Sequence, residues 1–252
     1  MAGGRILPQA RGGNQGARGA ALGQAERRYL ERGGLALNDV NLRDLERRWQ
    51  ASCSPEEEAA LLMGLCRSGQ LTRDRIELIA HCGNPGAIAV IGAPPTRVLQ
   101  DWCRTFAVWG REAAVRVLVA AIAPALPVLE EEFPGERRPA QLLGAIEAWI
   151  RDPCSSKREA VYEHHTFATW TQLLGGWREA EGVARPDAPA RVTGALADAA
   201  FIVLMSEAHL SLFSPREVEN GLMKVIPLAG EERVRAAILK ALLPWALGWD
   251  VR

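Results

Sequence analysis

The sequence lacks the local motifs that mark the common nucleotide and metal enzymes. It contains no GxxxxGK[ST] loop to hold phosphates and no HExxH pair to hold zinc. Its glycine-rich stretch, residues 1–23, is not framed by the strand and helix that a dinucleotide fingerprint requires. The sequence therefore predicts a non-enzymatic protein with no catalytic residues, no cofactor and no metal.

No charge of one sign dominates either. The chain carries 30 basic and 30 acidic residues, so its net charge gives no long-range attraction to nucleic acid or to an anionic membrane. Basic and acidic residues also alternate locally, as in Glu46-Arg47-Arg48, which is typical of a solvated surface. Binding of nucleic acid by such arginines is thus a weak alternative.

Paired cysteines and long apolar segments are missing as well. The five cysteines show no CxxC spacing, which indicates reduced, mostly buried side chains of a cytosolic protein. The N-terminal stretch has no apolar run of the roughly 7–15 residues that a secretory signal needs. Arg116, Pro124 and Pro127 interrupt the longest apolar run, which falls short of the roughly 20 residues that span a bilayer. We therefore expect a cytoplasmic protein with no membrane partner.

Strand signals are absent, and helical periodicity takes their place. From residue 20 onward, apolar and polar residues do not alternate with period two, and no Asn-Gly or Asp-Gly turn separates apolar runs as in a hairpin. The predicted fold class is all-α. The expected helices span residues 20–32, 39–51, 55–68, 72–82, 85–92, 95–108, 110–123, 137–151, 156–181, 188–210, 215–227 and 230–246.

Several helix boundaries carry capping signals. Ser54, Thr72 and Ser214 each precede a helical pattern and offer a side-chain oxygen to the free N–H groups of its first turn. Glycines at the expected ends or turns are Gly69, Gly83, Gly92, Gly135 and Gly230. Residues 124–136, rich in proline and acid, are predicted to be the connection before helix 137–151, whose core face carries Ile146, Trp149 and Ile150.

Short helices with short connections predict stacked antiparallel helical hairpins. No fixed repeat of about 33 to 47 residues is found, so a degenerate HEAT-like α-solenoid and an irregular multi-helix bundle both stay open. The segment 181–191 contains two prolines and is the best candidate for an internal boundary. The predicted parts are a disordered Gly/Arg-rich tail (1–19), an N-terminal helical array (20–182) and a C-terminal helical part packed on it (188–252).

The histidines offer little for catalysis. His164 and His165 follow Glu163, but adjacent helical residues diverge by about 100° and cannot both join one ligand set. His81 beside Cys82 is better explained as a residue of a last helical turn than as a nucleophilic pair. A metal-dependent hydrolase that uses the His164/His165 region is kept as an alternative.

The chain contains eight tryptophans, more than a chain of this length usually carries. Trp102 lies seven residues before Trp109, and Trp170 seven before Trp177, so each pair would share one helical face. Core packing is the main interpretation. Because tryptophan is frequent in protein–protein hot spots, Trp170, Trp177 and Trp249 are the candidate partner-binding residues.

Residues 112–152 combine an Ala-rich helix, a Leu-Pro turn, an acidic stretch, Arg138-Pro139 and the run Ala145-Ile146-Glu147-Ala148-Trp149. This pattern resembles the helical domain of bacterial immunity proteins of the Imm5-like group. Residues 71–87 resemble a helical-pair motif of bacterial multi-helix proteins. The resemblance implies a rigid surface complementary to a toxin and no active site, with 112–152 serving as scaffold and the toxin or partner surface lying elsewhere.

The predicted function is therefore that of a non-enzymatic protein-binding helical protein, an immunity protein that neutralises a toxin. A second alternative is a scaffold or adaptor subunit of a bacterial multiprotein assembly, in which the Gly/Arg-rich tail becomes ordered on binding. In both cases the partner is another protein, and no small-molecule substrate is evident.

Overall fold

A computed structural model describes residues 39–165, 188–206 and 214–248, and these residues form helices and no strand. The fold is all-α, as predicted. The α-helices are α2 (Asp39–Ser52), α3 (Pro55–Arg67), α4 (Arg73–His81), α5 (Pro85–Ile91), α6 (Leu99–Thr105), α7 (Gly110–Ile122), α8 (Leu126–Glu132), α9 (Arg138–Arg151), α10 (Ser155–His164), α12 (Ala188–Leu204), α13 (Pro215–Ala229) and α14 (Glu231–Ala246). Two 3₁₀ turns, η1 (Phe106–Trp109) and η2 (Ala123–Ala125), flank α7.

The predicted caps are confirmed. Ser54 Oγ accepts a hydrogen bond from the N–H of Glu57 at 3.2 Å, and Thr72 Oγ1 accepts one from the N–H of Arg75 at 3.4 Å. The predicted glycines all adopt positive φ: Gly69 at 75°, Gly83 at 96°, Gly92 at 76°, Gly135 at 102° and Gly230 at 86°. Local chemistry thus sets these boundaries.

Within residues 124–136 the structure has a helix that the sequence did not predict, whereas the turn predicted at Gly135 is found. Residues Leu126–Glu132 form α8, and the chain turns only after it, where Gly135 has φ 102°. Pro127 lies in the first turn of α8, where a residue needs no N–H to close a helical hydrogen bond. The prolines therefore start a helix here. At the other end of the chain, α12 stops at Leu204, before the predicted end at residue 210.

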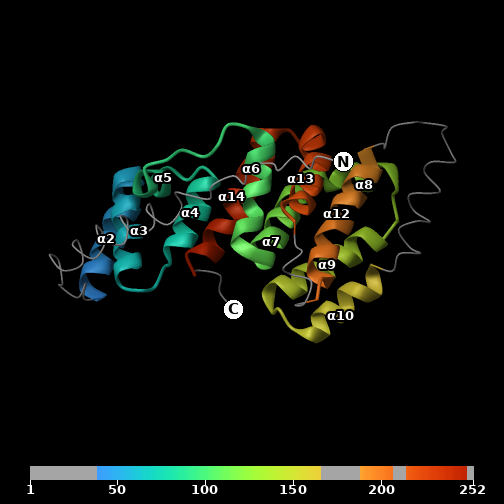
Figure 1. Cartoon of the computed structure of the whole chain (residues 1–252), viewed down its shortest axis with the longest axis horizontal. Coiled ribbons are helices and arrows are strands. Elements are labelled where there is room, and N and C mark those ends of the chain that lie inside the picture. The colour runs from blue at the N-terminus through green and yellow to red at the C-terminus, as the bar shows by residue number, and fades with distance from the viewer. Residues whose placement is uncertain (1–38, 166–187, 207–213, 249–252) are drawn as a thin grey trace, which may run out of the picture.

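Helix α7 is the centre of the main core. It packs against α12, α14, α13 and α9, and most of its side chains are buried, among them Val115, Leu118 and Ile122 at 0% exposure. Figure 1 shows an elongated molecule with α2 and α3 at one end and α8, α9 and α10 at the other.

The C-terminal hairpin of α13 and α14 packs in the middle of the array. Helix α14 contacts both α4 and α7, so it links the N-terminal helices to the main core. Trp245 of α14 lies between two guanidinium groups, with Arg75 5.3 Å and Arg116 4.9 Å from its ring centre. In a linear solenoid, each repeat contacts its sequence neighbours, so the order in space departs from chain order at α14.

The prediction that most cysteines are buried is wrong. Cys82 and Cys103 are buried, Cys66 and Cys154 are half-buried, and Cys53 is exposed. Cys53 lies in the short connection between α2 and α3, where its backbone has φ 50°. It is exposed because it belongs to this connection and not to the buried face of a helix. All five thiols are free, and no disulfide closes a loop among them.

Leu99–Glu132 is apolar and long enough, by hydropathy and length, to cross a membrane. In the fold this stretch is divided into α6, η1, α7, η2 and α8, and Gly110 breaks it with φ 86°. Of its most apolar window, 56% is buried inside the protein. Its hydrophobicity is thus accounted for by the position of α7 in the core.

Candidate functional site

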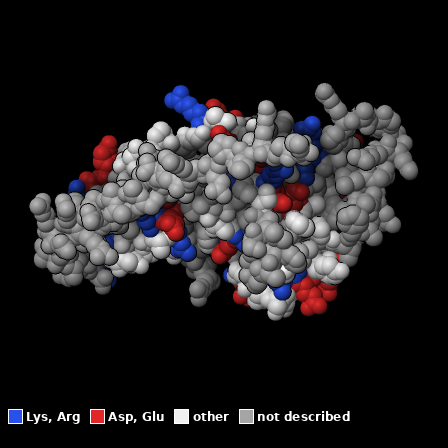
Figure 2. All heavy atoms as spheres, viewed as in Figure 1, with Lys and Arg blue, Asp and Glu red and all other residues white. Residues whose placement is uncertain are grey.

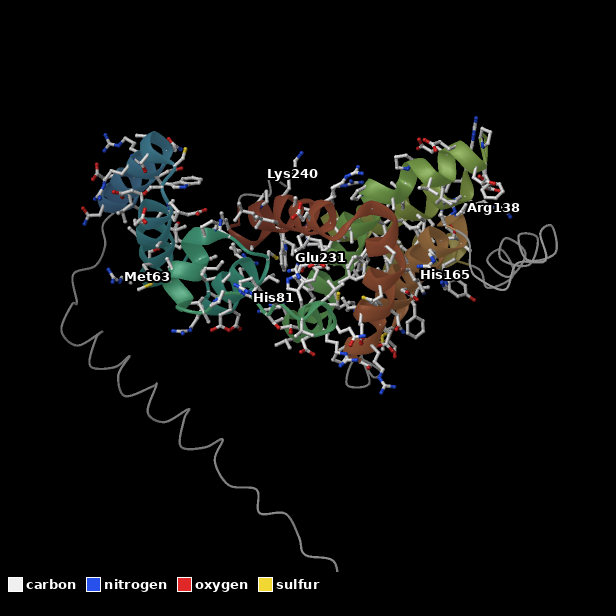
Figure 3. The ribbon with its side chains drawn as sticks, turned by 90° about the horizontal axis from the view of Figure 1, so that it is seen from above. Met63, His81, Arg138, His165, Glu231 and Lys240 are labelled. Carbon is white, nitrogen blue, oxygen red and sulfur yellow. The ribbon has the colours of Figure 1, made fainter. Side chains whose placement is uncertain are left out.

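A groove lies between α8 and α9, at the end of the molecule where Arg138 is labelled in Figure 3. Helices α8 and α9 both pack on α12 and leave a hollow of about 300 Å³ between them. We call it the α8–α9 groove. Its lining residues are Leu126, Leu129, Glu130, Phe133, Gly135, Glu136, Pro139, Ala140, Leu143, Gly144 and Glu147.

The sequence pattern of each helix explains the groove. On α9, Leu142 and Ile146 are fully buried and fix the helix on the core, while Ala140, Leu143 and Glu147 form a neighbouring stripe at helical spacing. On the other side, Leu126 and Leu129 of α8 and Phe133 at its C-terminal cap repeat the same three-to-four-residue spacing. Two mainly apolar stripes therefore line one hollow, and both helices pack against α12.

The charges of the groove are acidic. Arg138 forms an ion pair with Glu136 and lowers the pKa of that carboxyl from 4.5 to about 2. Glu136 is therefore ionised at neutral pH, and the positive charge of Arg138 balances its negative charge. Neither Glu130 nor Glu147 has an ion-pair partner among residues 39–165, 188–206 and 214–248. Those two carboxylates leave the groove with a net negative charge.

Gly144 distinguishes this groove from the helix contacts elsewhere. A Cβ atom added at Gly144 would meet nothing within 4 Å, although glycine costs a helix interior about 1 kcal/mol relative to alanine. Other helical glycines have a packing reason, because an added Cβ would lie 2.9 Å from Leu42 at Gly64, 2.6 Å from Glu58 at Gly86, 3.3 Å from Lys224 at Gly194 and 2.5 Å from Leu118 at Gly221. No contact among the described residues accounts for Gly144.

Two other hollows have less distinct chemistry. One of about 710 Å³ lies between α2, α3 and α5, and both signs of charge line it, including Asp44, Arg48 and Arg67. Another of about 450 Å³ lies beside Trp149 and Arg158. On the face shown in Figure 2, blue and red atoms likewise form small mixed groups.

The His164/His165 region does not assemble a ligand set within the described ranges. His164 is the last residue of α10, and the N–H of His165 closes the helix by donating to Val161 O at 2.9 Å. Burial lowers the pKa of His165, while Glu159 and Glu163 are exposed. In residues 39–165, 188–206 and 214–248, no three His, Cys, Asp or Glu side chains are grouped to hold a metal ion.

His81 and Cys82 are structural. The imidazole Nε2–H donates to Trp102 O at 2.8 Å, and Trp102 Nε1–H donates to His81 O at 2.9 Å. The His81 ring also stacks on Trp102, with 5.9 Å between centres, and lies 5.2 Å from the ring of Trp109. Burial lowers the pKa of His81 and raises that of the Cys82 thiol to about 12, so Cys82 is not a thiolate nucleophile at neutral pH.

The three candidate partner-binding tryptophans, Trp170, Trp177 and Trp249, lie outside the described residues. Core packing is confirmed for Trp102, at 0% exposure, and for Trp149, at 5%. Sequence reasoning missed the groove residues Glu130, Gly144 and Glu147. Two signals pointed to them: an acidic run at a helix end, and a glycine in the middle of an amphipathic helix.

No family model, no curated protein and no solved structure matches this chain. Its function is therefore inferred from the geometry of the groove.

Proposed function

We propose that this chain is a non-enzymatic helical protein that binds another protein through a preformed surface, and that the partner is a toxin it neutralises. The observation that carries the proposal is the α8–α9 groove. It has two mainly apolar stripes and two carboxylates without an ion-pair partner among residues 39–165, 188–206 and 214–248, on helices that pack against α12. A preformed surface loses little conformational entropy on binding, which favours tight association.

The resemblance to immunity proteins supports the choice of partner. It covers residues 112–152, which contain most of α7 and all of α8 and α9. The groove therefore lies in the segment that the resemblance gives as scaffold, and this proposal departs from the resemblance on that point. Part of that segment, Leu142, Ile146 and Trp149, is core and acts as scaffold. The neighbouring stripe of α9 lines the groove, where we place the partner.

The proposal is tested by capture followed by reconstitution. The tagged full chain is used to capture partners from the source cells, and the enriched protein is then purified and titrated against the chain by calorimetry. We expect a one-to-one complex, and growth inhibition by the partner that co-expression of this chain relieves. The immunity function would be contradicted if no protein were enriched under several conditions, or if co-expression of this chain did not restore growth.

A further inference from the structure

We propose that the α8–α9 groove binds a cationic amphipathic helix of the partner, with its apolar side chains over Gly144 and its Lys or Arg side chains toward Glu130 and Glu147. This inference rests on the proposed protein-binding function and adds the chemistry of the partner's segment.

The open space at Gly144 gives the first reason. A helix pays for glycine in its interior, and glycine is used there where another backbone or side chain must approach closely. At Gly64, Gly86 and Gly221 that approaching group belongs to this chain. At Gly144, which lines the groove, no described residue lies within 4 Å of an added Cβ, so an external group can approach the helix backbone there.

The acidic residues of α8 give the second reason. Glu130, Glu131 and Glu132 are the last three residues of the helix, and all three are exposed. Carboxylates at this end face the negative pole of the helix dipole, which destabilises the helix. No cation among residues 39–165, 188–206 and 214–248 forms an ion pair with them. An external cationic segment supplies the missing counter-charge.

The dimensions suit a helix. Helix α9 has 14 residues and is therefore about 21 Å long, which matches about four turns of a partner helix lying beside it. The hollow of about 300 Å³ is at the lower end of the roughly 300–1,000 Å³ typical of small-molecule pockets, so it suits a few anchoring side chains. Apolar residues recurring every three to four positions on the partner would fit between the two stripes.

Two segments of this chain are other candidates for the groove. Residues 166–187 carry three acidic residues and two arginines, so their charge does not complement Glu130 and Glu147. Residues 1–38 carry six arginines and two glutamates and do complement it. The chain's own N-terminal segment must therefore be tested against the external helix.

The probes are two fluorescein-labelled 18-residue peptides, one with Leu on one helical face and Lys on the other, and one with Glu in place of every Lys. Binding to the full chain is measured by fluorescence anisotropy at about 0.15 M salt. We expect the Lys peptide to bind at least about tenfold more tightly than the Glu peptide, because Glu130 and Glu147 attract lysine side chains and repel glutamate side chains. Equal affinities for the two peptides would overturn the proposal.

Three variants locate the binding. Gly144→Leu adds a side chain at a position where a Cβ atom meets nothing within 4 Å, and Glu130→Lys with Glu147→Lys reverses the charge of the groove. Each change should weaken binding of the Lys peptide roughly tenfold or more. The control is Glu56→Lys with Glu232→Lys, the same double charge reversal at exposed positions of α3 and α14, which should change affinity by less than about twofold. Unfolding curves verify that each variant is folded. Wild-type affinity in both groove variants would overturn the proposal.

A deletion of residues 1–38 separates the remaining occupant. Unchanged affinity for the Lys peptide supports the external helix, whereas a tenfold gain would show that the N-terminal segment occupies the groove and would overturn the proposal. The captured partner is also titrated against Gly144→Leu. Loss of that complex supports both proposals, and a complex of undiminished affinity would overturn the groove while leaving the protein-binding function in place.

Discussion

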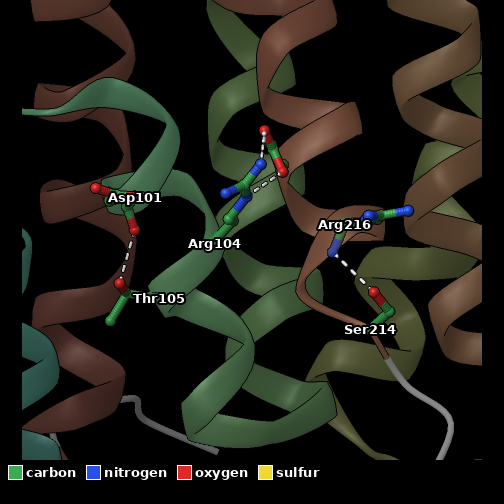
Figure 4. Close-up of polar contacts among 6 residues, drawn as sticks. Asp101, Arg104, Thr105, Ser214 and Arg216 are labelled. Atoms are coloured by element: carbon green, nitrogen blue, oxygen red, sulfur yellow. Dashed lines mark hydrogen bonds and ion pairs between the residues drawn. The ribbon is translucent and has the colours of Figure 1, made fainter. Parts of the chain in front are cut away.

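Two regions of the molecule use charged and small residues in opposite ways. Around α13, Arg104 of α6 donates two hydrogen bonds to Glu219 of α13, the shorter one 2.6 Å from Nε to Oε2. Figure 4 labels Arg104 and draws its polar contacts as dashed lines. Lys224 Nζ lies 2.6 Å from Asp198 Oδ2, which joins α13 to α12. In the α8–α9 groove, Glu130 and Glu147 form no ion pair within the described residues.

The difference separates residues that hold the fold from residues that are free to serve another role. Removing Arg104 or Lys224 leaves Glu219 (12% exposed) or Asp198 (24% exposed) largely buried and without its counter-charge, so stability constrains these positions. A change at Glu130, Gly144 or Glu147 leaves the core contacts of α8 and α9 intact. The groove residues can therefore be varied in binding experiments without unfolding the protein.

The largest expected effect contrasts two glycines. Gly221→Leu should lower the free energy of unfolding by about 3 kcal/mol, because an added Cβ lies 2.5 Å from the fully buried Leu118. Gly144→Leu should leave it unchanged or raise it by up to about 1 kcal/mol, because leucine is a better helix former. Urea denaturation followed by circular dichroism measures both. Equal losses in the two variants would show that the groove is not open.

The second effect concerns the aromatic cluster at His81. Burial lowers the pKa of this imidazole below 6.5, so the unfolded chain binds the proton more tightly. The contribution of neutral His81 to the free energy of unfolding should be fully present above pH 6.5 and should decrease as the pH drops below 6.5. His81→Gln keeps a donor for Trp102 O but cannot titrate; it should cost roughly 1–2 kcal/mol at neutral pH and flatten the profile. A variant that keeps the wild-type slope would assign it to another group.

The third effect belongs to the groove and is smaller. Arg138 lowers the pKa of Glu136 from 4.5 to about 2, so this pair stabilises the fold above pH 4.5 and ceases to do so as the pH falls toward 2. Glu136→Gln should cost less than about 1 kcal/mol at neutral pH, because both side chains are partly exposed. Acid titrations of unfolding should show a shallower slope in the variant, and an unaltered slope would contradict this contribution.

The sequence predicted what depends on neighbouring residues. Ser54, Thr72 and the turn glycines act on their own backbone, and the helices they bound were found in place. The start of α8 was missed because proline ends a helix or begins one according to its position in the turn, and Pro127 begins one.

Long-range features could not be predicted in the same way. The position of α14 between α4 and α7 depends on contacts between residues more than 100 positions apart in the sequence. One is the hydrogen bond that Arg75 Nη1 donates to Ala246 O, across 171 positions. The groove depends on where α12 holds α8 and α9 apart. In the sequence alone, Gly144 cannot be told apart from any other glycine within a helix. It becomes informative only once the structure shows that an added Cβ would meet nothing within 4 Å.

The smallest expected effect tests whether the groove acids are kept against local stability. Glu130→Lys puts a cation at the C-terminal end of α8 and should raise the free energy of unfolding by about 0.3–1 kcal/mol. The matched control is Glu56→Lys in the first turn of α3, which should lower it by a similar amount, because a cation there faces the positive end of the dipole. Both changes should shrink at high salt. We expect Glu130→Lys to be more stable and to bind the Lys peptide more weakly. Stability and binding would then change in opposite directions at one residue, as expected of a carboxylate retained for a partner. A less stable variant would mean that Glu130 supports the fold instead.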